Sequence, residues 1–149
     1  MRENVDEHHD YIMVELMTQC NFCEIFQGRE DYVIWEDEHF MLILDTMPAK
    51  RGSSMVIPKK HVDYIFDLDD SLYTKLFSTV KQLSVYLKKV THAKRIGIVV
   101  FGFEVPHVHI HLIPLHKGNE LFNQSLFKKA SDEELKELRA IIQQEIASS

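Results

Sequence analysis

Polar and branched aliphatic side chains alternate strictly along residues 107–112, which read His-Val-His-Ile-His-Leu. Successive side chains of a strand point to opposite faces, so the pattern predicts a strand with three imidazoles on one face and three aliphatic side chains in a core. In a helix the same spacing would scatter the imidazoles around the axis. Pro106 and Pro114 bracket the run, as expected of prolines at strand ends.

Other apolar patterns predict the elements around this strand. Strands are expected at 32–35, 39–44, 54–58 and 95–101, with the acidic residues 36–38 forming a hairpin turn. Apolar residues recur at three- and four-residue steps from Leu72 to Val90 and from Leu135 to Ile146, which predicts two amphipathic helices. Possible N-caps lie at 67–71, and Ser131 to Glu134 form a capping-box pattern. These elements predict one α+β domain, in which helices pack on a mostly antiparallel sheet.

Composition narrows the class of protein. The 149 residues are 45% hydrophobic and 27% charged, as in an ordinary globular domain. The net charge of −6 disfavours a polynucleotide partner. No apolar run approaches the length that spans a bilayer, and the polar, acidic residues 1–10 lack the regions of a secretory signal, so no membrane partner and a cytoplasmic location are expected. Cys20 and Cys23 are then expected to be reduced or metal-bound.

Three imidazoles on one strand face concentrate groups that can act as nucleophile, general acid or base, or metal ligand near neutral pH. One histidine on a strand is usually an ordinary polar residue, but three in strict alternation indicate function. A transition-metal site remains an alternative, since alternating histidines on a strand permit one.

The run His107 to Leu112 resembles the signature of the histidine triad (HIT) superfamily of nucleotide hydrolases and transferases. The preceding Gly102-Phe103-Glu104-Val105-Pro106 resembles the approach to the triad in a bacterial branch with an EVPHxHxHLIP-type motif. Three further stretches lie where the family places its other motifs. They are Cys-Asn-Phe-Cys-Glu-Ile-Phe at 20–26, Leu44-Asp45, and Gly-Ser-Ser-Met-Val-Ile-Pro-Lys-Lys-His at 52–61. The resemblance covers about residues 19–115 and implies a HIT-like fold, with a sheet of about five strands, one long central helix and a C-terminal helix. We therefore expect residues 1–18, in which 11–17 fit a short helix, to be an extension, and 19–149 to be the HIT domain.

The resemblance implies that His109 is a nucleophile that attacks the α-phosphorus of a nucleotide and forms a nucleotidyl-histidine intermediate, flanked by His107 and His111. Histidine rather than glutamine at 111 favours hydrolysis over nucleotidyl transfer. The implied substrates are phosphoramidates, acyl or aminoacyl adenylates and dinucleoside polyphosphates of a purine nucleoside. No cofactor is expected for the chemistry, and relatives commonly form homodimers. A nucleotide-binding or scaffold protein with little catalysis is the alternative.

The resemblance also assigns the binding positions. Asp45 matches the acid that binds the ribose hydroxyls, while Ser53 and Glu104 lie where relatives contact phosphate. Phe103 and Glu104 replace Gln and Ser of many relatives, and an ionised Glu104 would repel a close phosphate. The expected base-binding slot is apolar and consists of Phe22, Ile25 and Ile43.

Cys20 and Cys23 have the gap that lets two thiolates reach one zinc, but a structural zinc site needs four ligands. The resemblance implies the other two ligands of zinc-containing relatives: the first triad histidine, here His107, and a histidine at the position of Ser53. Because a serine stands there, reduced thiols without metal are expected. Lys59, Lys60 and His61 are interpreted as a basic strand end or a phosphate contact.

Overall fold

The computed structural model describes residues 20–26, 28, 32–122 and 129–148 of the chain. The helices and strands follow in the order α2 (Asn21–Ile25), β1 (Val33–Glu36), β2 (Phe40–Leu44), β3 (Ser54–Pro58), η2 (Ile65–Asp67), α3 (Asp70–Thr91), β4 (Arg95–Val99), β5 (Ile110–Leu115), η3 (Glu120–Phe122) and α4 (Asp132–Ala147). The expected short helix at 11–17 lies outside the described residues. No helix in the described part of the chain is long and apolar enough to cross a membrane.

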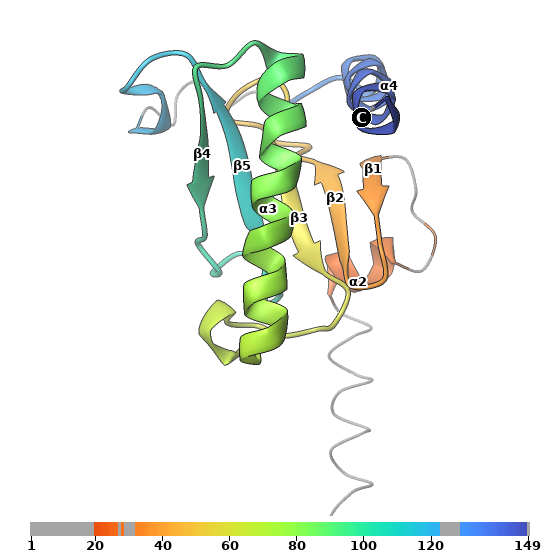
Figure 1. Cartoon of the computed structure of the whole chain (residues 1–149), viewed down its shortest axis with the longest axis vertical. Helices are drawn as coiled ribbons and strands as arrows, with labels where there is room; N and C mark the ends of the chain where they lie inside the picture. Colours follow the sequence, from red (N-terminus) through yellow and green to blue (C-terminus); the bar gives the residue numbers. More distant parts are fainter. Residues whose placement is uncertain (1–19, 27, 29–31, 123–128, 149) are drawn as a thin grey trace, which may run out of the picture.

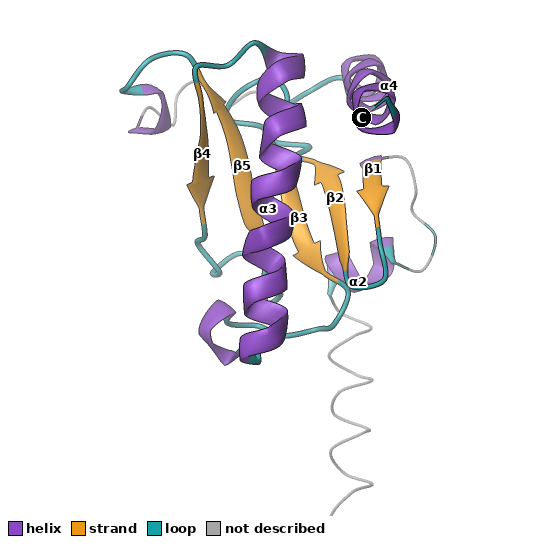
Figure 2. Ribbon diagram, viewed as in Figure 1, coloured by secondary structure: helices purple, strands orange, loops and turns teal. Residues whose placement is uncertain are grey.

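The five strands form one antiparallel sheet in the order β1-β2-β3-β5-β4 (Figure 1). Because β5 inserts between β3 and β4, β4 lies at the edge of the sheet. Figure 2 shows the long helix α3 crossing one face of the sheet, with α4 beside it near β1. The α+β class and the five-strand antiparallel sheet with a long helix and a C-terminal helix are therefore confirmed.

The central strands β2 and β3 are buried on both faces, which is why both read as continuous apolar runs. Alternate side chains of the sheet enter a large cluster that packs against α3 and α4, including Leu42, Val56, Ile110 and Leu112. The intervening ones enter a smaller cluster on the opposite face, which α2 covers with Phe22, Cys23 and the preceding Cys20. The histidine face of β5 therefore lies toward this smaller cluster.

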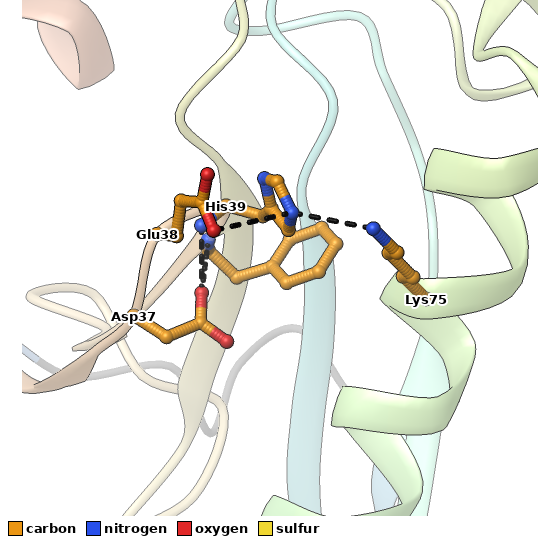
Figure 3. A network of polar contacts seen from close by, with 5 residues as sticks. Asp37, Glu38, His39 and Lys75 are labelled. Carbon is orange, nitrogen blue, oxygen red and sulfur yellow. Dashed lines mark hydrogen bonds and ion pairs between the residues drawn. The ribbon is translucent and has the colours of Figure 1, made fainter.

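Asp37 shapes the turn between β1 and β2 (Figure 3). Its Oδ1 accepts hydrogen bonds from the backbone N–H groups of His39 at 2.8 Å and Phe40 at 2.7 Å. The His39 ring continues the network, since its Nε2 lies 3.3 Å from Nζ of Lys75 on α3. The acidic hairpin turn expected from the sequence is thus confirmed and also contacts the central helix.

The cap predictions hold, while the triad strand differs in its limits. Asp69 and Ser131 accept hydrogen bonds from the N–H groups three residues on, as N-caps of α3 and α4. β5 begins at Ile110, because the N–H of Val108 donates to the carbonyl of Val62 at 2.7 Å instead of joining the β3 ladder. Pro114 lies inside β5 and not at its end. The hydrogen-bonded ladder between β5 and β3 stops at Leu112, so the missing N–H of Pro114 is tolerated.

Candidate functional site

His109 lies just before β5, is buried, and has a defined tautomer. Its Nδ1 lies 2.7 Å from the backbone carbonyl oxygen of His107. A carbonyl oxygen only accepts, so Nδ1 carries the proton and Nε2 carries the lone pair. In its neutral form the ring is therefore held with Nε2 free to react as a nucleophile.

His107 is fully buried and held in the opposite tautomer. Its Nε2 lies 2.8 Å from the carbonyl oxygen of Pro58, so Nε2 donates and Nδ1 carries the lone pair. Burial is the largest cause that lowers the pKa of His107 to about 4; the nearby His61 and His109 act in the same direction, while the bond to the Pro58 carbonyl opposes them. The first triad histidine is thus neutral at pH 7, and both of its ring nitrogens have partners other than His109.

His111 and Asp45 form a partly buried pair, with 3.8 Å between Nδ1 and Oδ2. Burial, together with the charge of the nearby His109, lowers the pKa of His111 to about 4. Burial also raises the pKa of Asp45, against the hydrogen bond of 2.8 Å that its Oδ1 accepts from the N–H of Met47. Asp45 therefore lies within the triad site, where the resemblance implied a ribose contact.

The apolar residues expected to hold a base gather beside the nucleophile. The ring of Phe22 lies 5.1 Å from that of His109, in an edge-to-face arrangement. Ile43 and the partly buried Ile25 belong to the same cluster as Phe22. The structure thus brings Ile43 of β2 together with Phe22 and Ile25 of α2, although the binding of a base to them remains a prediction.

Ser53 is buried in a local turn. Its Oγ accepts from the N–H of Lys50 at 3.2 Å, and its carbonyl oxygen accepts from the N–H of Asp45 at 2.9 Å. Gly52 makes this turn possible, because its φ is +85° and a Cβ would lie 2.7 Å from Thr91 Cγ2. Ser53 therefore positions Asp45, and its expected phosphate contact remains untested.

Four possible metal ligands converge on the other side of His107, from Cys20, Cys23, His61 and His107. Their ligand atoms all lie within 4.8 Å of one another. The His107 Nδ1 lone pair lies 3.4 Å from Cys20 Sγ, 3.5 Å from Cys23 Sγ and 3.2 Å from His61 Nδ1. His109 and His111 are not part of this group, so the triad does not form the metal site that its alternation allowed.

The donor set fits zinc. Zn–S bonds of about 2.3 Å and Zn–N bonds of about 2.0 Å place tetrahedral ligands about 3.3 to 3.8 Å apart. Two cysteines and two histidines form a common structural site, and the tautomer of His107 directs a lone pair into it. Burial, with Cys20 beside it, raises the pKa of the Cys23 thiol to about 12, so the thiolate requires a cation nearby.

His61 is the ligand that the sequence analysis missed. The resemblance points to position 53, where a serine stands; the structure supplies the fourth donor from the loop that follows β3. The available signal was a histidine three residues after Pro58, the residue whose carbonyl binds His107. The neighbouring Lys59 and Lys60 instead pair with Glu36 and Asp69 at 2.7 and 3.5 Å, as expected of a basic strand end.

Glu104 and Phe103 are exposed in the connection between β4 and β5. Gly102 turns this connection with a φ of +75°, a conformation that favours glycine. Val105 fixes the far end, because it packs on the smaller cluster and its carbonyl accepts from the N–H of His107 at 2.8 Å. Glu104 is therefore held at the rim of the triad site and not within it.

Comparisons with known proteins agree with this geometry. A model of the HIT domain matches residues 27–118. The crystal structure of a hypothetical histidine triad nucleotide-binding protein from Sulfolobus tokodaii superposes with a TM-score of 0.72 at 31% identity, covering 87% of this chain and 93% of that one. A Zn-bound histidine triad family protein from Mycobacterium smegmatis has a TM-score of 0.71 at 27% identity, covering 89% and 99%. The adenylylsulfatase HINT3 of Arabidopsis thaliana is 28% identical over 142 residues, which cover 89% of this chain and 72% of that protein.

Proposed function

The chain belongs to the histidine triad (HIT) family, and from this premise we propose that it is a hydrolase that cleaves at the α-phosphate of a nucleotide through a covalent intermediate on His109. The family includes nucleotide hydrolases, among them the adenylylsulfatase of Arabidopsis thaliana. The observation that carries the proposal is the 2.7 Å contact between His109 Nδ1 and the His107 carbonyl oxygen, which leaves the Nε2 lone pair free.

In the first step, Nε2 of His109 attacks the α-phosphorus, and the bond between phosphorus and the leaving group breaks. The leaving group takes the electron pair of that bond and a proton from solvent. The ring stays protonated at Nδ1, and the His107 carbonyl stabilises the positive charge that develops on it. Water then attacks the phosphorus, releases the nucleoside monophosphate and returns a proton to solvent, which regenerates the neutral His109.

The surrounding residues supply the binding contacts in this proposal. The Phe22, Ile25 and Ile43 cluster lies next to the nucleophile and accommodates a purine base. Asp45 binds the ribose hydroxyls, in an orientation fixed by the N–H of Met47. His111, adjacent to Asp45, contacts the phosphate oxygens.

A mass-spectrometric time course tests the function. Wild type, His109→Ala and the control His116→Ala are incubated with adenosine phosphoramidate, an aminoacyl adenylate and a diadenosine polyphosphate. His116 is an exposed residue beyond β5, so its loss should leave turnover unchanged. We expect release of adenosine monophosphate by wild type and His116→Ala, and a loss of at least about 10³-fold in His109→Ala.

The alternative, a nucleotide-binding protein with little catalysis, predicts a different result. Wild type would then bind adenosine monophosphate but release none from any of the three substrates. Retained binding in His109→Ala, measured by calorimetry, shows that the substitution removed chemistry and not the fold.

We also propose that Cys20, Cys23, His61 and His107 bind a structural zinc ion. The four donors and their spacing support this, as does the zinc bound by the relative from Mycobacterium smegmatis. All four positions are taken by protein ligands, so the ion would stabilise the start of β5 and take no part in the hydrolysis. Zinc would hold His107, whose carbonyl in turn orients the nucleophile.

We further propose that the protein forms a homodimer through β4 and α3. β4 is an edge strand, with one side free of strand partners among the described residues. Exposed Ile98 on β4 and Val85 on α3 border a cleft of about 460 Å³ between these two elements. Pairing of two β4 edges around a two-fold axis would bury both side chains.

A further inference from the structure

A carboxylate from η3 joins the connection between β2 and β3 to the end of β5. Glu120 Oε1 lies 2.9 Å from Nζ of Lys50, which belongs to that connection. Glu120 Oε2 accepts hydrogen bonds from the backbone N–H groups of His116 at 2.6 Å and Lys117 at 2.9 Å, directly after β5. The two joined segments lie at the same end of the sheet, because β3 and β5 run antiparallel (Figure 1).

Glu120 is held firmly in this position. Its side chain is 11% exposed. A Cβ at Gly97 would lie 3.4 Å from Leu121 Cδ1, so the next residue of η3 packs on the glycine of β4. The hydrogen bond from the Lys117 N–H, followed by the contact with Lys50, lowers the pKa of Glu120 to about 2, so the group is ionised at pH 7. A carboxylate with three donors and little exposure forms stronger contacts than an ordinary surface ion pair.

Lys50 transmits this restraint to Asp45 through the backbone. The carbonyl oxygen of Lys50 accepts from the N–H of Ser53 at 2.9 Å, and the Lys50 N–H donates to Ser53 Oγ at 3.2 Å. The Ser53 carbonyl oxygen in turn accepts from the N–H of Asp45 at 2.9 Å. The side-chain contact with Glu120 and the backbone bonds toward Asp45 therefore meet at Lys50.

The second contact of Glu120 acts on the strand that carries His111. β5 ends at Leu115, and Glu120 binds the two N–H groups that follow. Asp45 Oδ2 and His111 Nδ1 lie 3.8 Å apart, one on each of the joined segments. A shift between the segments would displace Asp45 from a ligand that His111 also contacts, and a misplacement of about 1 Å can lower a rate about 100-fold.

In an inference that rests on the nucleotide site proposed above, we propose that Glu120 is a positioning residue for Asp45. It acts through Lys50 and thereby sets the preference for a ribonucleotide over a nucleotide without ribose hydroxyls. The reactivity of His109 does not depend on it. An ion pair that only closed a surface loop would change stability and leave this preference unaltered.

Calorimetric binding of adenosine monophosphate and of 2′,3′-dideoxyadenosine monophosphate tests the inference without requiring turnover. Kd is measured for both ligands with wild type, Glu120→Gln, Lys50→Met and Lys50→Arg. The matched controls are Glu133→Gln and Lys136→Met, two exposed charges on α4. Asp45→Asn, alone and combined with Glu120→Gln, serves as the reference for loss of the ribose contact.

Wild type is expected to bind adenosine monophosphate about tenfold more tightly than the dideoxy ligand. Glu120→Gln and Lys50→Met should each lower this ratio about fivefold and leave the Kd of the dideoxy ligand unchanged, which also shows that the variants fold. Lys50→Arg keeps the cation and should keep most of the ratio. Glu120→Gln should add no further loss to Asp45→Asn, because both substitutions act on one contact. The controls should match wild type.

The outcomes separate this inference from the function on which it rests. An unchanged ratio in Glu120→Gln and Lys50→Met would overturn the positioning role, as would equal losses in Lys50→Arg and Lys50→Met. A further loss on adding Glu120→Gln to Asp45→Asn would overturn the route through Asp45. Equal Kd values of wild type for the two ligands would overturn the ribose contact and this inference together, whereas hydrolysis is decided separately by the turnover of wild type and His109→Ala.

Discussion

His107 connects the chemistry of the site to its framework through three of its atoms. Its Nε2 binds the Pro58 carbonyl on β3, its Nδ1 faces the two thiols and His61, and its backbone carbonyl holds Nδ1 of His109. A substitution at 107 therefore removes a strand contact, a metal ligand and the anchor of the nucleophile together. For this reason, loss of activity on substitution of His107 does not identify it as a catalytic residue, whereas His109 and His111 can be tested separately.

His111 predicts a pH dependence of stability. Its pKa is about 4 in the folded protein, lowered by burial and by His109, compared with about 6.5 when unfolded. Between these values the unfolded chain binds the proton and the folded chain does not, so the free energy of unfolding decreases as the pH falls from about 6.5 toward 4. His111→Asn removes this term and should lessen the loss of stability between pH 7 and pH 5 by about 1 kcal/mol, after allowance for solvent screening.

Urea unfolding of wild type, His111→Asn and His116→Ala at pH 7 and pH 5 measures this difference. The exposed His116 provides the control for removing a histidine from the same chain. The same change in unfolding free energy in all three proteins would contradict the assignment of the pH dependence to His111.

At the scale of elements, the periodicity of apolar residues correctly predicted which side chains of the strands enter the core. Val108, Ile110 and Leu112 enter the core below α3, as their alternation requires, and β2 and β3 read as apolar runs because both of their faces are covered. The limits of β5 could not be read from alternation. They depend on a bond from Val108 to Val62, a residue 46 positions earlier in the chain.

The group of four metal donors was likewise only partly predictable from the sequence. Cys20 and Cys23 are a recognisable pair, but His61 meets Cys23 across 38 residues and His107 across 46. Only the pairing of β3 with β5 and the packing of α2 bring these donors together. Sequence spacing therefore indicated the two cysteines, the family resemblance added His107, and His61 depended on tertiary structure.

These donors predict that zinc stabilises the junction of α2, β3 and β5. Protein purified without a histidine tag should contain about one zinc per chain, and His61→Ala should lose it, because three ligands remain of the four that a structural site requires. Loss of zinc should lower the thermal unfolding midpoint by more than about 5 °C. Elemental analysis and calorimetry measure the two quantities.

His116→Ala again serves as the control and should keep both the metal and the midpoint. Chelation of wild type should shift its midpoint to that of His61→Ala. Metal-free wild type, or full zinc content in His61→Ala, would contradict the assignment.

At the scale of the molecule, one edge of the sheet differs from the other. β1 lies beside α4 (Figure 1). β4, in contrast, leaves Ile98 50% exposed and borders a cleft whose lining includes Ile96 and Val80. Lys81, Lys88, Lys94 and Arg95 border this cleft. An unprotected edge strand next to an apolar cleft favours pairing with a second copy. The bordering cations of the two copies would repel each other, so pairing should be stronger at higher salt, which screens this repulsion.

This asymmetry predicts the effect of placing a charge on β4. Wild type should sediment as a dimer at micromolar concentration, and Ile98→Lys should sediment as a monomer, because the new charge would be buried against the same charge of the partner. Ile141→Lys places an equal charge on an exposed apolar position of α4, outside the cleft, and should remain dimeric. Sedimentation velocity at low and high salt distinguishes the cases. A monomeric wild type, or dissociation of both variants alike, would contradict a β4 interface, and restored dimerisation of Ile98→Lys by high salt would attribute its effect to charge repulsion.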